Sequence, residues 1–197
     1  MSMRAIFARL VLGLFGWKAE GEGPQVPKCV LVAAPHTSSW DVPLLNLMAW
    51  VYGVQIRWMM KAEMFRGPRG PFFRALGGIP IDRGQRNNMV QQCIDAFRAS
   101  DELVLVIPPE GTRAAADAWK SGFYRIALGA GVPLHLGYLD YKRKRGGFGP
   151  LLELSGDPQA DMARIRAFYR ADMAKYPERF GDVRLADPSA GTTPLAE

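Results

Sequence analysis

Residues 29–41, CVLVAAPHTSSWD, decide the fold of this 197-residue chain. The apolar run 29–34 predicts a buried strand that ends at Pro35. A helix is predicted directly after it, because apolar residues recur at helical spacing: Val42, Leu45, Met48, Ala49 and Tyr52. His36 therefore lies in a strand-to-helix turn at the carboxyl end of a strand, which is where open α/β sheets bind their ligands.

His36 and Asp41 are five residues apart, and residues at that spacing do not share a face of an ideal helix. Because His36 precedes the helix, the turn can fold back so that Asp41 reaches one ring nitrogen. That contact would set the imidazole tautomer and leave the other nitrogen free as a base. The alternative is a capped helix after a surface histidine: the hydroxyls at 37–39 suit a helix cap, and Asp41 suits the first turn.

The composition is typical of one globular domain, and its positive charge indicates an anionic partner. The chain has 25 basic and 19 acidic residues, a net charge of +6 and a pI near 9.5. No recognition helix and no basic-aromatic strip is evident, so we expect no nucleic acid partner, and acidic lipid or a phosphorylated small molecule remains. Cys29 and Cys93 are expected to be buried free thiols. With two histidines and no Cys/His cluster, a zinc site is not expected.

The remaining chain alternates between strand and helix patterns. Strands are predicted at 56–60, 103–107, 132–140 and 151–154, with a glycine turn into a short strand at 77–83. Helices are predicted at 72–76, 87–97, 119–130 and 159–175. This alternation predicts an α/β fold with a mostly parallel central sheet flanked by helices. We expect the domain to cover 28–181, after an N-terminal segment at 1–18 and a loop at 20–27, and the tail at 187–197 to be disordered.

The segment 3–17, MRAIFARLVLGLFGW, is apolar but contains Arg4 and Arg9. It is too short for a membrane span, which needs about 20 apolar residues. Two interpretations stay open. The segment is either an amphipathic helix in a membrane interface or a helix packed on the domain core. In the first case we expect an exposed apolar face near the His36 site, formed by Phe7, Leu10, Leu14, Phe15 and Trp17.

Four turns carry chemistry: 36–41, 61–74, Asp82-Arg83 and 110–113. Together they resemble the glycerolipid acyltransferase family typified by 1-acyl-glycerol-3-phosphate acyltransferases. HTSSWD at 36–41 is similar to its His-x4-Asp motif, GGIPIDR at 77–83 to its second block, PEGTR at 109–113 to its third and VPL at 132–134 to its fourth. Three residues depart from the pattern and bear on pocket shape: Pro80 and Pro108 replace the usual Phe, and His135 interrupts the fourth block.

The resemblance implies a glycerol-3-phosphate acyltransferase-like fold and a definite reaction. A fatty acyl chain would pass from acyl-CoA or acyl carrier protein to the hydroxyl of a lysophospholipid such as 1-acyl-glycerol-3-phosphate. His36, held by Asp41, would be the base, and the attacking oxygen would belong to the acceptor. Such an enzyme needs no metal or bound cofactor and would be peripheral, on the cytoplasmic face of a membrane. The open alternatives are an acyl-enzyme on Ser38 or Ser39, an acyl-thioester hydrolase, and a non-catalytic lipid-binding membrane protein.

Cationic residues would bind the phosphates of the substrates. Arg83 and Arg113 suit the acceptor phosphate, because a guanidinium grips phosphate in bidentate fashion. Glu110 would orient Arg113 or cap the turn. Gly111 and Thr112, in the same turn, also belong to the expected substrate-binding site. The loop cations are expected either to bind the donor phosphates or the membrane or to be solvated: Lys61, Arg66, Arg69 and Arg74. The run 142–145 is expected to be a solvated or membrane-facing patch.

Overall fold

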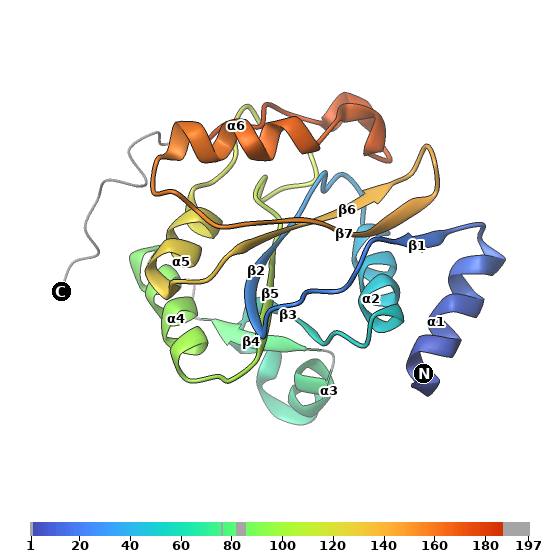
Figure 1. The fold of residues 1–197 in the computed structure, drawn as a ribbon. Coiled ribbons are helices and arrows are strands. Elements are labelled where there is room, and N and C mark those ends of the chain that lie inside the picture. The colour runs from blue at the N-terminus through green and yellow to red at the C-terminus, as the bar shows by residue number, and fades with distance from the viewer. Residues whose placement is uncertain (1, 76, 82–85, 187–197) are drawn as a thin grey trace.

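Seven strands form one sheet in the computed structural model, which describes residues 2–75, 77–81 and 86–186 (Figure 1). Their order across the sheet is β1-β7-β6-β2-β5-β3-β4. The pair β6 and β7 is antiparallel and every other pair is parallel, which confirms the predicted α/β class. The bounds are β1 Lys18–Glu20, β2 Lys28–Ala33, β3 Ile56–Lys61, β4 Gly78–Ile81, β5 Leu103–Ile107, β6 Leu134–Asp140 and β7 Arg145–Leu152.

The central strands β2 and β5 are covered by helices on both faces, which explains their continuous apolar sequences. Val30 and Val32 face α4 (Arg86–Arg98), α5 (Gly122–Ala130) and α6 (Pro158–Phe168). Leu31 faces the opposite way, toward α2 (Asp41–Val51). The predicted free thiols are buried in these two layers, Cys93 in the first and Cys29 in the second, and burial raises the pKa of each to about 12.

The sheet extends further than the sequence predicted. β1 was not predicted, and β7 begins six residues before the strand expected at 151–154. β7 contains Gly146, Gly147 and Gly149, so it lacks the apolar alternation that indicates a strand. The glycine at 147 is required by the neighbouring strand, because a Cβ there would collide with the carbonyl oxygen of Glu20 in β1.

The helix α1 (Met3–Leu14) packs on the outer side of α2. Its small residues Ala5 and Ala8, together with Leu12, are buried, and Trp17 is buried in a T-shaped contact with Tyr141, with ring centroids 5.0 Å apart. The expectation that Trp17 belongs to the exposed apolar face was therefore wrong, because this side chain fills the junction with the sheet. Among the described residues, none of the helices has the length and hydropathy to span a membrane.

The chain after α6 lies across the carboxyl ends of the strands. The helix predicted at 159–175 ends at Phe168, where Tyr169 turns inward and places its hydroxyl 3.0 Å from the carbonyl oxygens of Val32 and Gly137. Two short 3-10 helices follow, η3 (Ala171–Met173) and η4 (Pro177–Arg179). The core continues through Val183 and Leu185, and the tail expected to be disordered lies outside the described residues.

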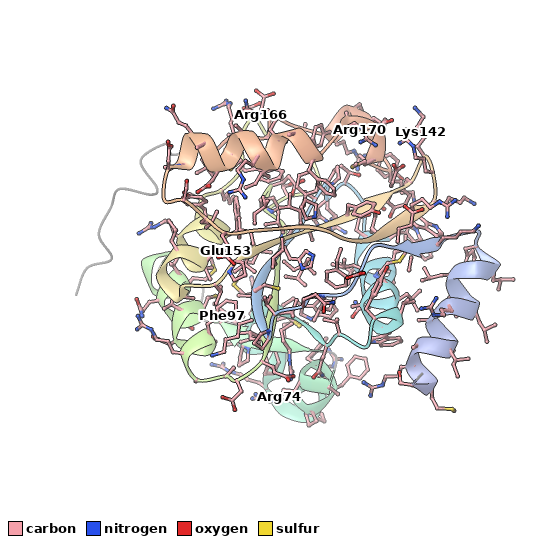
Figure 2. The ribbon with its side chains drawn as sticks, viewed as in Figure 1. Arg74, Phe97, Lys142, Glu153, Arg166 and Arg170 are labelled. Atoms are coloured by element: carbon pink, nitrogen blue, oxygen red, sulfur yellow. The ribbon has the colours of Figure 1, made fainter. Side chains whose placement is uncertain are left out.

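The basic run at 142–145 covers the end of the turn between β6 and β7 and the first residue of β7. Lys142 and Arg170 lie side by side in Figure 2, and both bind Asp172 on η3, at 3.3 Å and 3.2 Å. Arg143 binds the buried Asp140 at 2.8 Å. Lys142 and Arg143 are therefore ion-paired, and their contacts with Asp172 join the chain after α6 to the turn between β6 and β7. The bounds of the remaining elements are η1 Ala62–Phe65, η2 Gly67–Arg69 and α3 Gly70–Ala75.

Candidate active site

The dyad predicted from the sequence is formed. His36 Nδ1 lies 3.0 Å from Asp41 Oδ2, with the His36 side chain 18% exposed and the Asp41 side chain 9% exposed. An ionised carboxylate only accepts hydrogen bonds, so Nδ1 carries the proton and Nε2 is left with its lone pair. His36 Nε2 has no hydrogen-bond partner among the described residues, and the ring lines a cavity. The arrangement is that of an oriented base.

Asp41 closes the turn by accepting four hydrogen bonds. Besides His36 Nδ1, its Oδ2 accepts from the backbone N–H groups of Thr37 at 3.0 Å and Ser38 at 2.9 Å, and its Oδ1 accepts from the Tyr141 hydroxyl at 2.6 Å. The expectation that the 37–39 hydroxyls cap the helix was wrong, because the cap residue is Trp40 and no side chain caps it. The Asp41 carboxylate, in the first turn of α2, accepts the backbone N–H groups of Thr37 and Ser38, so the hydroxyls do not act as caps.

The hydroxyls of the turn serve other contacts. Ser38 Oγ accepts from the backbone N–H of Trp40 at 3.2 Å, and Thr37 Oγ1 accepts from that of Tyr176 at 3.3 Å. The latter contact fixes the segment after α6 to the residue next to His36. Ser39 lines the cavity. Within the described part of the chain, neither Ser38 nor Ser39 is hydrogen-bonded to His36, so the contact that would activate a serine nucleophile is not formed.

Glu110 is a structural neighbour of His36. The sequence suggested that it orients Arg113 or caps its turn, but no ion pair joins these two residues in the described structure. Its buried Oε1 accepts the backbone N–H of His36 at 3.0 Å, and its Oε2 has no partner among the described atoms. Burial raises the pKa of Glu110, and the hydrogen bond from His36 partly opposes this. The Glu110 carboxyl thus ties the β5 turn to the β2 turn.

The residues after Glu110 face the cavity. Gly111, Thr112 and Arg113 are exposed and line it, and their binding of substrate stays a prediction. Gly111 has a φ of +66°, and an added Cβ would lie 2.6 Å from Lys120 Nζ. Lys120 also lines the cavity and was missed by the sequence analysis. Its backbone N–H donates to the carbonyl of Pro109 at 2.9 Å, a contact between residues 11 apart that no local pattern indicates.

The remaining predicted cations are placed differently. Lys61 ends β3 and is exposed, and it is not among the described residues that line the cavity. Arg83 lies outside the described residues. Arg66, Arg69 and Arg74 are exposed, and the Arg74 guanidinium lies 5.2 Å from the Phe65 ring centroid. Figure 2 places Arg74 at the opposite end of the molecule from Lys142 and Arg170.

The cavity has a volume of about 1130 Å³ and is lined by both polar and apolar residues. His36, Arg113 and Lys120 supply polar groups, and the walls include Leu45, Trp58, Met59, Phe73, Phe123 and Ile126. Pro108, one of the departures from the family pattern, also lines it. A second departure, His135, is buried, and its Nε2–H donates to the carbonyl oxygen of Gly149 across 2.9 Å, so it belongs to the core.

Comparison with known proteins identifies the family. A family model described as Acyltransferase matches residues 20–135, more than half of the chain. The crystal structure of the 1-acyl-sn-glycerophosphate (LPA) acyltransferase PlsC from Thermotoga maritima has a similar fold, with a TM-score of 0.54 and 18% sequence identity over 78% of this chain and 68% of that chain. No curated protein matches the sequence. The fold, the dyad and the family model agree, and the chain belongs to the acyltransferase family.

Proposed function

We propose that this acyltransferase moves a fatty acyl chain from a thioester donor, acyl-CoA or acyl carrier protein, to the hydroxyl of a lysophospholipid such as 1-acyl-glycerol-3-phosphate. The observation that carries the proposal is the His36–Asp41 pair at the edge of an apolar-walled cavity. PlsC from Thermotoga maritima, which shares the fold, is described as acting on that acceptor. The cavity volume of about 1130 Å³ lies above the range of about 300–1,000 Å³ typical of small-molecule sites, and its apolar walls suit a long acyl chain.

The reaction follows from the free lone pair on His36 Nε2. This nitrogen takes the proton of the acceptor hydroxyl as its oxygen attacks the thioester carbonyl carbon. The new C–O bond forms, the C–S bond breaks, and the imidazolium returns its proton to the leaving thiolate. Asp41 stabilises the imidazolium between these two steps. The expectation that no metal or bound cofactor takes part stays a prediction.

Arg113 is the cation best placed for an acceptor phosphate. It lines the cavity, lies three residues after Glu110 and has no ion pair with a described carboxylate. A guanidinium that is not paired within the protein is available for bidentate binding to phosphate. Lys120, on the other side of Gly111, adds a second positive charge to the same cavity wall.

The exposed face of α1 supports docking on an anionic membrane. Met3, Phe7, Leu10 and Leu14 follow one another at three- and four-residue spacing and are 85%, 55%, 69% and 82% exposed. Arg4 and Arg9 on the same helix are exposed and would meet acidic headgroups. The opposite face of α1 packs on α2, so the helix both belongs to the domain and presents an apolar stripe.

An activity assay tests the reaction. Purified protein is incubated with radiolabelled acyl-CoA or acyl carrier protein and a panel of lysolipids, and the His36→Ala variant is run in parallel. We expect labelled diacyl product from the wild type and none from the folded variant. Full turnover in a folded His36→Ala protein would remove the proposed base. Release of free fatty acid that is indifferent to acceptor would identify a thioester hydrolase.

A flotation assay tests the docking face. The double variant Phe7→Ser/Leu14→Ser should bind vesicles containing acidic phospholipid less tightly than the wild type, and salt should weaken the remaining binding. Leu151→Ser is the matched control, since Leu151 is a 37% exposed apolar residue on β7. Equal vesicle binding by the wild type and both variants would show that α1 is not the docking face.

A further inference from the structure

We propose that Tyr141 is a positioning residue of the dyad, whose hydroxyl holds the Asp41 carboxylate so that Oδ2 faces His36 Nδ1. This inference rests on the proposed role of His36 as the base. The Tyr141 hydroxyl donates to Asp41 Oδ1 at 2.6 Å. Among the described residues, Asp41 Oδ1 has no other hydrogen-bond partner, whereas Oδ2 has three donors.

Tyr141 reaches Asp41 because of the sheet order. It follows Asp140, the last residue of β6, and β6 pairs in parallel with β2, the strand that leads to His36. Parallel neighbours end at the same edge of a sheet, so residues 100 apart in sequence meet there. The arrangement therefore follows from topology and is invisible in any local motif.

The ring of Tyr141 is held on several sides. Its backbone N–H donates to the carbonyl of Met173 at 2.9 Å. Trp17 makes a T-shaped contact with the ring, with centroids 5.0 Å apart, and Lys175 Nζ lies 5.9 Å from the ring centroid. These contacts, from Trp17 between α1 and β1 and from the segment after α6, fix the ring, so its hydroxyl has a constant direction. Burial and the neighbouring Asp41 raise the pKa of Tyr141 above its usual range, so the hydroxyl stays a donor.

A carboxylate needs such an anchor to act as an orienter. Rotation about its terminal torsion is soft, with a broad and roughly two-fold profile. Bonds to one oxygen allow the plane of the group to swing about that oxygen. A short bond to the second oxygen fixes the plane and, with it, the line from Oδ2 to His36. The same hydrogen bond draws negative charge toward Oδ1. It therefore also weakens the electrostatic attraction between the Asp41 carboxylate and a protonated His36.

Tyr141→Phe tests the inference with the smallest available change. The variant keeps the ring and its contacts with Trp17 and Lys175 and loses the hydroxyl. We expect kcat to fall by about 10- to 100-fold, the range implied by one hydrogen bond to a charged group, because the loss of a fixed carboxylate plane outweighs the stronger attraction of Asp41 for the imidazolium; the acceptor KM should change little. Thermal unfolding is measured alongside to establish that the variant is folded.

A direct titration supplies a readout that does not depend on activity. The chain has two histidines, so the ring signals of His36 and His135 can be followed by proton NMR and assigned with a His135→Leu variant. In Tyr141→Phe the midpoint of the His36 titration should move to higher pH, because the Asp41 carboxylate attracts the imidazolium more strongly. Other charged groups near the turn stay unchanged: Glu110, Arg113, Lys120, Lys175 and Arg179.

Tyr52→Phe is the matched control. The Tyr52 hydroxyl donates to the carbonyl of Glu20 at 2.7 Å, at the far end of α2, so its loss should leave both kcat and the His36 midpoint unchanged. An unmoved midpoint in Tyr141→Phe overturns the inference, whatever happens to kcat. If the wild type transfers no acyl group, the proposed function fails, while the titration still decides whether Tyr141 acts on the dyad.

Discussion

Asp41→Asn is the substitution that tests the dyad most sharply, because asparagine can keep every contact of Asp41. Its carbonyl oxygen can replace Oδ2 and accept from His36, Thr37 and Ser38. Its amide can replace Oδ1 and donate to the Tyr141 hydroxyl oxygen, which has two lone pairs. The substitution therefore removes the charge and preserves the geometry. We expect the free energy of unfolding to change by less than about 2 kcal/mol.

The cost to catalysis follows from the distance in the dyad. His36 Nδ1 and Asp41 Oδ2 are 3.0 Å apart. With charge centres about 4 Å apart and an effective dielectric constant of about 20, an imidazolium and a carboxylate attract by about 4 kcal/mol. The imidazolium forms only as His36 takes the acceptor proton, so the attraction stabilises the transition state and not the bound substrates. Its loss should lower kcat by about 10³-fold and leave KM nearly unchanged.

The assay follows thiol release from acyl-CoA in the presence of a lysophospholipid, with diacyl product quantified in parallel. Chemical denaturation of the same samples separates a catalytic loss from unfolding. Asp95→Asn is the control, since Asp95 is an exposed carboxylate on α4 with a weak contact to Arg98 at 3.8 Å. A folded Asp41→Asn enzyme with kcat within tenfold of the wild type would refute the role of Asp41 as the electrostatic partner of the base.

Three further outcomes are expected. Arg113→Ala should raise KM for a phosphate-bearing acceptor and leave the donor KM and the KM for a monoacylglycerol unchanged, which steady-state kinetics will measure. Because burial raises the pKa of Glu110 above 4.5, the folded state keeps a proton that the unfolded chain releases. The wild type should therefore lose stability relative to Glu110→Gln as pH rises from about 4.5, in urea denaturation. Burial lowers the pKa of His135 below 6.5, so the unfolded chain takes up the proton first. The wild type should lose stability relative to His135→Leu as pH falls below 6.5. An equal dependence of the free energy of unfolding on pH in the two proteins would contradict this.

The sequence was informative where structure depends on neighbouring residues. The apolar run at 103–107 coincides with β5, and the strand before His36 is β2, since strands covered on both faces are continuous in apolar residues. The His36–Asp41 contact was also predictable, because both groups lie in one short turn. Local patterns failed at β7, where glycines replace the alternation, and at β1, which has only three residues.

Contacts between distant segments were decided by the tertiary structure. Glu110 binds the backbone of His36 from 74 residues away, and Tyr141 binds Asp41 from 100 residues away. Lys120 reaches the cavity because its backbone joins the Pro109 turn. Trp17, which follows α1, is buried, whereas Met3, Phe7, Leu10 and Leu14 on α1 are exposed, a difference that hydropathy does not encode.

The physical reason is the difference between local and long-range interactions. A strand, a turn or an amphipathic helix is specified by side chains a few residues apart, so its residues can be identified along the chain. The neighbours of His36 are specified by which strands pair, and here β5 and β6 flank β2 and end at the same edge. The sequence by itself determined the contact between His36 and Asp41 and the α/β class, and the pairing of parallel strands around β2 decided which residues surround that contact.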